Sequence, residues 1–154
     1  MISVSQAPEN NLPALRRKAR HYALQALYQW EMAKQPLHEI QAQFLTDYDM
    51  KHVDTEYFGE MLHDIPANLN ELQDEFEPLL DRKLSDLDPI ELSLLRMGVW
   101  ELKNRIDVPY KVVINECVNL AKRFGATDGH RYINSILDKV AANTRKIEMA
   151  AARK

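Results

Sequence analysis

The chain has 154 residues, of which 45% are hydrophobic and 28% are charged, with a formal net charge of −3. This length can form one domain with its own core, the four glycines are too few for a turn-rich all-β fold, and no apolar run reaches the roughly 20 residues of a membrane span. Residues 1–11 lack the basic and apolar regions of a signal peptide. A single cysteine, Cys117, excludes an internal disulfide, so we expect a cytoplasmic protein.

The small net charge hides a strong asymmetry along the chain. Residues 47–88 contain 13 acidic and 3 basic residues, a net charge of −10, whereas the remainder contains 10 acidic and 17 basic residues, a net charge of +7. A polyanion would therefore contact the two ends of the chain and avoid its middle. The acidic middle is either a solvated face or a surface for a basic protein.

The first predicted helix covers residues 13–34 and begins with Pro13, which suits a first helical turn. Four basic residues lie within five positions at its start, and Arg16 and Arg20 are one turn apart with Arg17 on the adjoining flank. Because guanidinium groups suit phosphate, the hypothesis is that this edge binds nucleic acid, against the alternative of a solvated face. The apolar stripe of the helix comprises Ala19, Tyr22, Ala23, Ala26, Leu27 and Trp30.

Three shorter helices are predicted next. Apolar residues recur at helical spacing in residues 37–45, 53–63 and 69–80. A polar loop at 46–51 separates the first two, and Pro66 is expected to break or kink the second, or to open the third.

A more apolar helix is predicted over residues 89–104. Asp88 is its expected N-cap, with Pro89 at the first position and Glu91 at the third. Its nearly continuous apolar middle predicts a central place in the fold.

Two more helices complete the pattern. One covers residues 109–124, with Gly125 as its expected left-handed end. Thr127 or Asp128 is expected to cap the last helix, whose stripe begins at Tyr132. Residues 145–154 are basic and alanine-rich and are expected to fray.

The predicted fold is all-α, a bundle of about seven helices with two small sub-bundles in one domain. Its expected divisions are a flexible tail at 1–12, a helical domain at 13–143 and a basic tail at 144–154. No phosphate-binding loop, nucleophile elbow or metal-ligand spacing occurs in the sequence. Cys117 lies on an apolar stripe and is expected to be a core residue. We therefore expect neither an enzyme nor a bound metal or cofactor.

Three ordered blocks carry a resemblance to a known family. They are Arg16–Arg20 with the Gln-Ala-Leu-Tyr of 25–28, the segment from Glu91 through Leu95-Arg96 to the Trp-Glu-Leu of 100–102, and the Val-Pro-Tyr-Lys-Val-Val-Ile-Asn-Glu of 108–116 continuing to residue 138. On these blocks the sequence resembles the NusB family of bacterial transcription antitermination factors, over residues 14–142.

The resemblance implies an all-α protein without catalytic activity. Family members bind the boxA element of nascent RNA together with the ribosomal protein NusE, and join NusA, NusG and RNA polymerase to support ribosomal RNA transcription. It implies RNA-binding roles for Arg16, Arg17, Arg20, Tyr28, Phe124, Asp128 and Tyr132. Glu91 is the expected partner-binding residue, on the analogy and on its charge together.

Each of these roles has a structural alternative. Tyr132 and Phe124 could be packing residues, and Asp128 and Glu91 could serve as helix caps. The whole chain could be a helical adaptor that binds only protein, or an accessory domain of an RNA methyltransferase, although no α/β cofactor domain follows. Some family members form homodimers, and the sequence leaves that state open.

Overall fold

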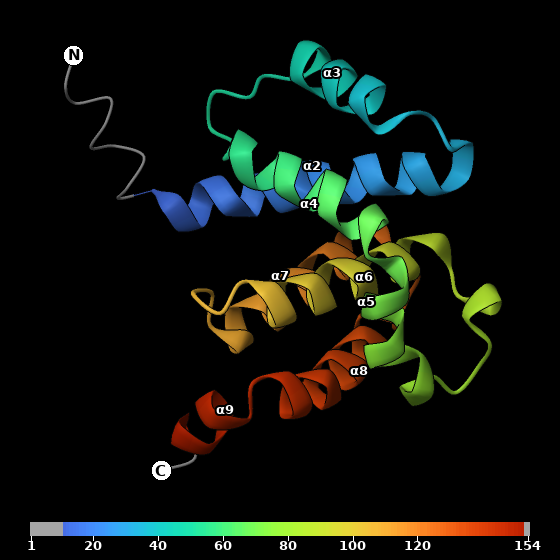
Figure 1. Cartoon of the computed structure of the whole chain (residues 1–154), viewed down its shortest axis with the longest axis vertical. Coiled ribbons are helices and arrows are strands. Elements are labelled where there is room, and N and C mark those ends of the chain that lie inside the picture. Colours follow the sequence, from blue (N-terminus) through green and yellow to red (C-terminus); the bar gives the residue numbers. More distant parts are fainter. Residues whose placement is uncertain (1–10, 153–154) are drawn as a thin grey trace. The chain divides into compact units, whose positions relative to one another are not determined.

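The computed structural model describes residues 11–152, and every regular element in that range is helical (Figure 1). The α-helices are α2 (Leu12–Ala33), α3 (Leu37–Asp47), α4 (Thr55–Ala67), α5 (Leu69–Phe76), α6 (Pro89–Asn104), α7 (Tyr110–Phe124), α8 (Gly129–Thr144) and α9 (Lys146–Ala152). Two short 3-10 helices, η1 (Glu77–Leu79) and η2 (Leu84–Asp86), lie between α5 and α6. The all-α prediction is confirmed, and no helix among the described residues is long and apolar enough to cross a bilayer.

The chain divides into two compact units, Met1–Asp64 and Ile65–Lys154. The first contains α2, α3 and most of α4, and the second contains the elements that follow. Ten residues of the expected N-terminal tail, 1–10, lie outside the described part of the chain.

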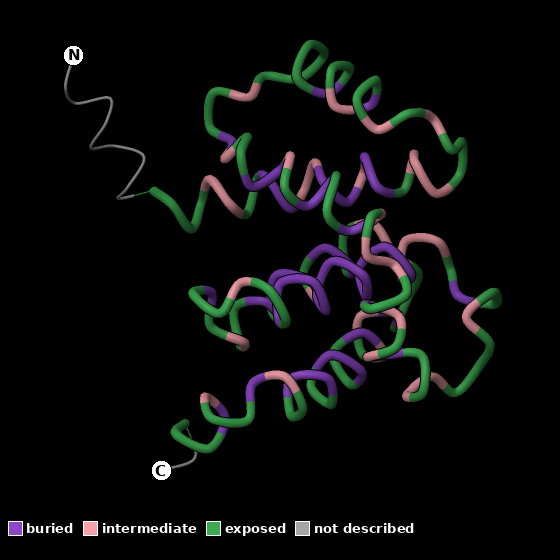
Figure 2. The backbone as a smooth tube through the Cα atoms, viewed as in Figure 1, coloured by how far each residue is buried: buried purple, intermediate pink, exposed green. Residues whose placement is uncertain are grey.

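In the first unit, α2 buries small residues along one side. Ala19, Ala23 and Ala26 have no exposed surface, which lets neighbouring groups approach the α2 backbone closely. Phe44 of α3 and Phe58 of α4 are also buried, with ring centroids 5.9 Å apart. Figure 2 shows the buried positions along α2 interrupted by exposed ones, as expected of an amphipathic helix.

The second unit is built around α6, which is buried from Glu91 to Leu102 as its composition predicts. Helices α6, α7 and α8 pack against one another. Gly98 permits one close contact, because a Cβ there would lie 2.7 Å from a methyl group of Leu137. Cys117 is 1% exposed and its thiol donates a hydrogen bond to the Leu94 carbonyl at 3.9 Å, so its prediction as a core residue is confirmed.

The start of α6 agrees with the sequence prediction, whereas the end of α4 does not. Asp88 caps α6 as predicted, its Oδ1 accepting hydrogen bonds from Ile90 N at 2.8 Å and Glu91 N at 3.4 Å. The expected break at Pro66 is wrong, since Pro66 lies inside α4 and α5 begins only at Leu69. Pro66 has no N–H to donate to the carbonyl four residues earlier, so α4 loses one helical hydrogen bond there, and the helix ends one residue later at Ala67.

The prediction of a left-handed end at Gly125 is also wrong. Gly125 has φ −95° and ψ −177°, an extended conformation that any residue can adopt. Its N–H instead donates to the Ala121 carbonyl at 2.8 Å, and a Cβ on Gly125 would lie 2.8 Å from the same oxygen. Glycine therefore serves a close backbone approach and not a positive φ.

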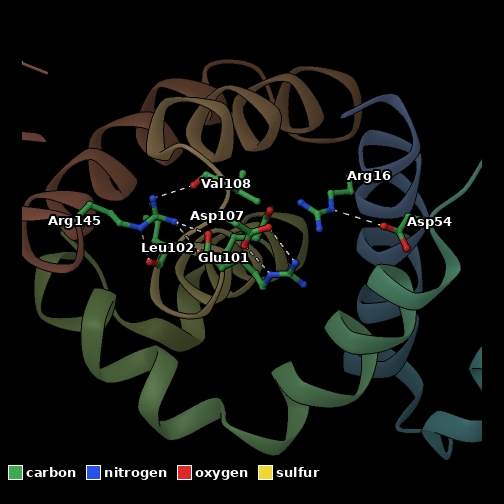
Figure 3. Close-up of polar contacts among 8 residues, drawn as sticks. Arg16, Asp54, Glu101, Leu102, Asp107, Val108 and Arg145 are labelled. Carbon is green, nitrogen blue, oxygen red and sulfur yellow. Dashed lines mark hydrogen bonds and ion pairs between the residues drawn. The ribbon is translucent and has the colours of Figure 1, made fainter. Parts of the chain in front are cut away.

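The C-terminal segment is not the frayed tail expected from its composition. Residues 146–152 form α9, and Arg145 just before it is buried. The Arg145 guanidinium donates hydrogen bonds to four backbone carbonyls at the end of α6 and in the loop that follows (Figure 3). It also pairs with Glu148. The carbonyls belong to Glu101, Leu102, Arg105 and Val108.

Candidate nucleic-acid interface

The arginines at the start of α2 do not share one environment. Arg20 is 2% exposed, and Arg16 is half-buried. Both guanidinium groups lie over the ring of Tyr57 in α4, at 4.6 Å for Arg16 and 5.6 Å for Arg20. Arg16 and Arg20 therefore lie one helical turn apart, as predicted. Both guanidinium groups contact the same aromatic ring of the protein.

Asp54 completes this contact. Its Oδ1 accepts a hydrogen bond from Tyr57 N at 3.0 Å at the start of α4, and its Oδ2 lies 3.7 Å from Arg16 Nε (Figure 3). Asp54 thus helps to begin α4 and also pairs with α2. Arg16 and Arg20 accordingly hold the first unit together.

An exposed basic and aromatic surface remains on the other side of α2. Arg17 and Lys18 are exposed, and Tyr28 is 37% exposed. Arg17 and Tyr28 are eleven residues apart, about three helical turns, and so lie on the same face of α2. We call Arg17, Lys18 and Tyr28 the α2 surface.

The three residues predicted near the last two helices lie in the second unit. Tyr132 is half-buried, and its hydroxyl oxygen accepts a hydrogen bond from Asp81 N at 3.3 Å. The Arg82 guanidinium lies 4.3 Å from the centre of the Tyr132 ring and is held by hydrogen bonds to the Asp81 carboxylate, the shortest 2.7 Å. One face of Tyr132 is thus already in contact with a planar cation.

The electrostatics of this cluster follow from those contacts. The hydrogen bond from Arg82 lowers the pKa of Asp81, with a smaller contribution from Tyr132. Burial raises the pKa of the Tyr132 hydroxyl, so the ring remains a neutral platform at physiological pH.

Glu91 is 7% exposed, which is unusual for a carboxylate. Burial raises its pKa, Asp88 raises it further, and Arg82 lowers it. Its carboxylate lies against Gly129 at the start of α8, where a Cβ would come within 2.5 Å of Oε2.

Asp128 and Phe124 mark the two ends of the α7–α8 connection. Asp128 occupies the N-cap position of α8 with φ 68°, but its side chain makes no capping hydrogen bond, so that part of the prediction is wrong. Its carboxylate instead lies near exposed Arg131, with 3.9 Å between Asp128 Oδ1 and Arg131 Nε. Phe124 is half-buried, and the Arg123 guanidinium lies 5.4 Å from its ring centre.

Sequence reasoning missed the residues that surround the predicted ones. Tyr57 and Asp54 lie some 40 positions after Arg16, and Asp81 and Arg82 lie about 50 positions before Tyr132. Their pairing depends on tertiary packing, for which no local pattern exists. Asp81 and Arg82 are adjacent and of opposite charge, which is the one local indication of an ion pair. In the sequence they appear as part of the acidic segment 47–88.

The fold and the α2 surface define a class of protein: an all-α protein with a basic and aromatic helix face and without a group of metal-binding side chains among the described residues. The family model for the NusB family matches residues 17–142. The chain therefore belongs to the NusB family.

Known relatives agree along most of the chain. The transcription antitermination protein NusB of Teredinibacter turnerae is 57% identical over 141 residues, covering 91% of this chain and 96% of the relative. That of Hahella chejuensis is 53% identical over 138 residues, covering 90% and 93%. A solved structure of T. maritima NusB superposes with a TM-score of 0.78 at 29% identity, covering 88% of this chain and 96% of that one.

Proposed function

We propose that the chain is a transcription antitermination factor that binds boxA-type single-stranded RNA together with the ribosomal protein NusE. The complex would join NusA, NusG and RNA polymerase and promote ribosomal RNA transcription, which takes place in the bacterial cytoplasm. The observation that carries the proposal is the 57% identity to a NusB antitermination protein over 91% of the chain. The proposed role is one of binding and involves no catalytic step.

The proposed RNA-binding residues of α2 differ in how directly they would contact RNA, because they differ in exposure. Arg17 would bind phosphate directly, because it is exposed and always charged. Tyr28 would offer its ring to a base, since splayed bases of single-stranded RNA stack on aromatic side chains. Arg16 and Arg20 would act by holding α2 in place and would reach RNA only with the part of the guanidinium that Tyr57 leaves open.

In the second unit, Phe124, Asp128 and Tyr132 are the proposed additional RNA contacts. Arg82 already stacks on Tyr132, so a base would use the remaining edge of the ring or would extend the stack on Arg82 itself. Asp128 would influence RNA through its charge beside the α8 N-terminus. Glu91 is the proposed contact for a basic partner such as a ribosomal protein, and its burial limits that contact to the edge of the carboxylate.

Fluorescence anisotropy with a boxA-type RNA and a scrambled RNA tests the proposal. Each would be titrated with and without NusE, using the unaltered chain, Arg17→Ala and Lys139→Ala, an exposed lysine on α8 that serves as a matched control. We expect tighter binding of boxA than of the scrambled RNA, further tightening with NusE, and a loss of affinity of several-fold for Arg17→Ala only. Equal affinity for both RNAs, untouched by Arg17→Ala, would contradict it.

One observation favours a second candidate, a helical adaptor that binds protein without RNA. Two of the three predicted arginines lie on Tyr57, which reduces the exposed cationic surface. The adaptor predicts binding of NusE with no measurable affinity for either RNA. The same titrations therefore separate the two functions.

A further inference from the structure

Five aromatic rings of the first unit form a continuous series from its core to its surface. Ring centroids are 5.9 Å apart for Phe58 and Phe44, 5.2 Å for Phe44 and Tyr48, and 5.0 Å for Tyr48 and Tyr22. His21 ends the series edge-on to Tyr22 at 4.9 Å. The inner two rings are buried, whereas Tyr48 is 40% exposed. The outer rings are thus surface groups anchored on the core.

This anchoring makes the outer rings a rigid surface. The series joins α2, α3 and α4, so three helices fix the ring positions. Tyr48 is also the C-cap of α3, with its N–H donating to the Phe44 carbonyl at 3.2 Å. A tyrosine held in this way loses little conformational entropy when another planar group stacks on it.

Basic side chains adjoin the rings along α2. Lys18 lies one turn before Tyr22, and Arg17 lies one turn before His21, so each cation is the helical neighbour of one ring. Both cations are exposed. Aromatic rings beside cations that track a phosphate backbone are the usual surface for a single strand.

Two carboxylates adjoin Tyr48 in the chain and bear on how a strand would lie. Asp47 and Asp49, both exposed, flank Tyr48 in the chain. Their carboxylates repel phosphate, so the strand backbone would run along α2 and point its bases toward α3.

We infer that Tyr22 and Tyr48 form a stacking platform for nucleobases of a single-stranded RNA whose phosphates bind Arg17 and Lys18. This inference rests on the proposed RNA-binding function and extends the α2 surface to α3. It assigns to two tyrosines a role that the resemblance did not give them. The ligand class is unpaired RNA, because the bases must be free to leave their own stack.

The test compares four variants of the full chain in boxA RNA titrations. Tyr48→Leu removes the ring, Tyr48→Phe keeps the ring and removes the hydroxyl, and Leu45→Ala is the matched control, since Leu45 is on the same helix and 43% exposed. We expect Tyr48→Leu to weaken binding about tenfold, and Tyr48→Phe and Leu45→Ala to change it less than about twofold. Tyr22→Leu provides a second loss of ring, and thermal melting monitors folding of every variant.

A spectroscopic readout reports stacking itself. 2-Aminopurine placed in turn at each base of the RNA should be quenched at one or two positions by the unaltered chain and by Tyr48→Phe, and not by Tyr48→Leu at saturating protein. If Arg17→Ala weakens RNA binding while loss of either ring changes neither affinity nor quenching, the platform is wrong and the proposed function stands. If the unaltered chain binds no RNA, both are wrong. Loss of NusE binding alone in Tyr48→Leu would make the rings a protein contact and would also overturn the inference.

Discussion

The three arginines at the start of α2 differ in exposure although they lie within five positions. They are Arg16, Arg17 and Arg20. Arg17 is exposed, Arg16 is half-buried beside Asp54, and Arg20 is buried on Tyr57. Helical geometry alone separates them, since Arg17 points about 100° away from Arg16 while Arg20 returns to the same side. Binding and stability are therefore expected to divide between the residues.

Replacing Arg20 and Arg17 separately by alanine tests this division. Arg20→Ala is expected to lower the free energy of unfolding by about 1–3 kcal/mol, because a buried guanidinium loses its contacts. Arg17→Ala is expected to change it by less than about 0.5 kcal/mol. Urea unfolding measures both, and equal destabilisation by the two variants would show that Arg17 is also a structural residue.

The titration of Glu91 makes the stability of the fold depend on pH. Its pKa is raised above the ordinary 4.5 mainly by burial, so the folded state binds the proton more tightly than the unfolded state. The contribution of Glu91 to stability is therefore complete below its unfolded pKa and is lost as pH rises through its folded pKa.

Glu91→Gln keeps the shape of the side chain and removes its titration. The variant is therefore expected to melt at a higher temperature than the unaltered chain at pH 7, with the difference shrinking as pH falls toward about 4.5 and staying small below it. Thermal melts at several pH values measure this, with Asp138→Asn on the exposed side of α8 as the control. A difference that grows toward low pH would reverse the assigned sign.

At the scale of elements, Arg145 explains why the C-terminal segment is ordered. In the last turn of α6 its guanidinium donates to the Leu102 carbonyl and to the Glu101 carbonyl, which also accepts from Arg105 N at 2.9 Å. Glu148 pairs with Arg145, and its other oxygen accepts a hydrogen bond from Tyr110 N at 2.9 Å at the start of α7. Arg145 and Glu148, at the start of α9, therefore form hydrogen bonds with the end of α6 and with the start of α7.

Arg145→Met replaces the buried cation by an apolar chain of similar length. We expect it to reduce the free energy of unfolding by about 3 kcal/mol, because several buried carbonyls lose their donor together. Urea unfolding tests this beside Lys146→Met, an exposed neighbour. A loss below about 0.5 kcal/mol would mean that water replaces the guanidinium at little cost.

Some helices could be located from the sequence alone. Helical periodicity and the Asp88 cap located α2, α3 and α6 to within about two residues, because these signals are local. Gly125 and residues 146–152 depart from the prediction because Gly125 lies close to the Ala121 carbonyl, and because Arg145 binds carbonyls some 40 positions earlier in the chain. Local composition contains neither.

At the scale of the whole molecule, the all-α class could be predicted because apolar spacing repeats in every segment. In the candidate site, the arginines could be predicted from their charge and helical spacing, whereas the other residues were carried over from a resemblance. Which of them are exposed depends on Tyr57 for the arginines and on Arg82 for Tyr132, contacts between residues far apart in the sequence. The same long-range packing assembled the Tyr22–Tyr48 surface, which no sequence pattern singled out.

Antitermination itself is the central claim, and a reconstituted transcription assay measures it most directly. RNA polymerase with NusA, NusG and NusE would transcribe a template carrying boxA upstream of a terminator, with and without this chain. We expect the chain to increase readthrough on this template, and a mutated boxA or Arg17→Ala to reduce the increase. Readthrough that is unchanged by the chain, or raised equally without boxA, would contradict it.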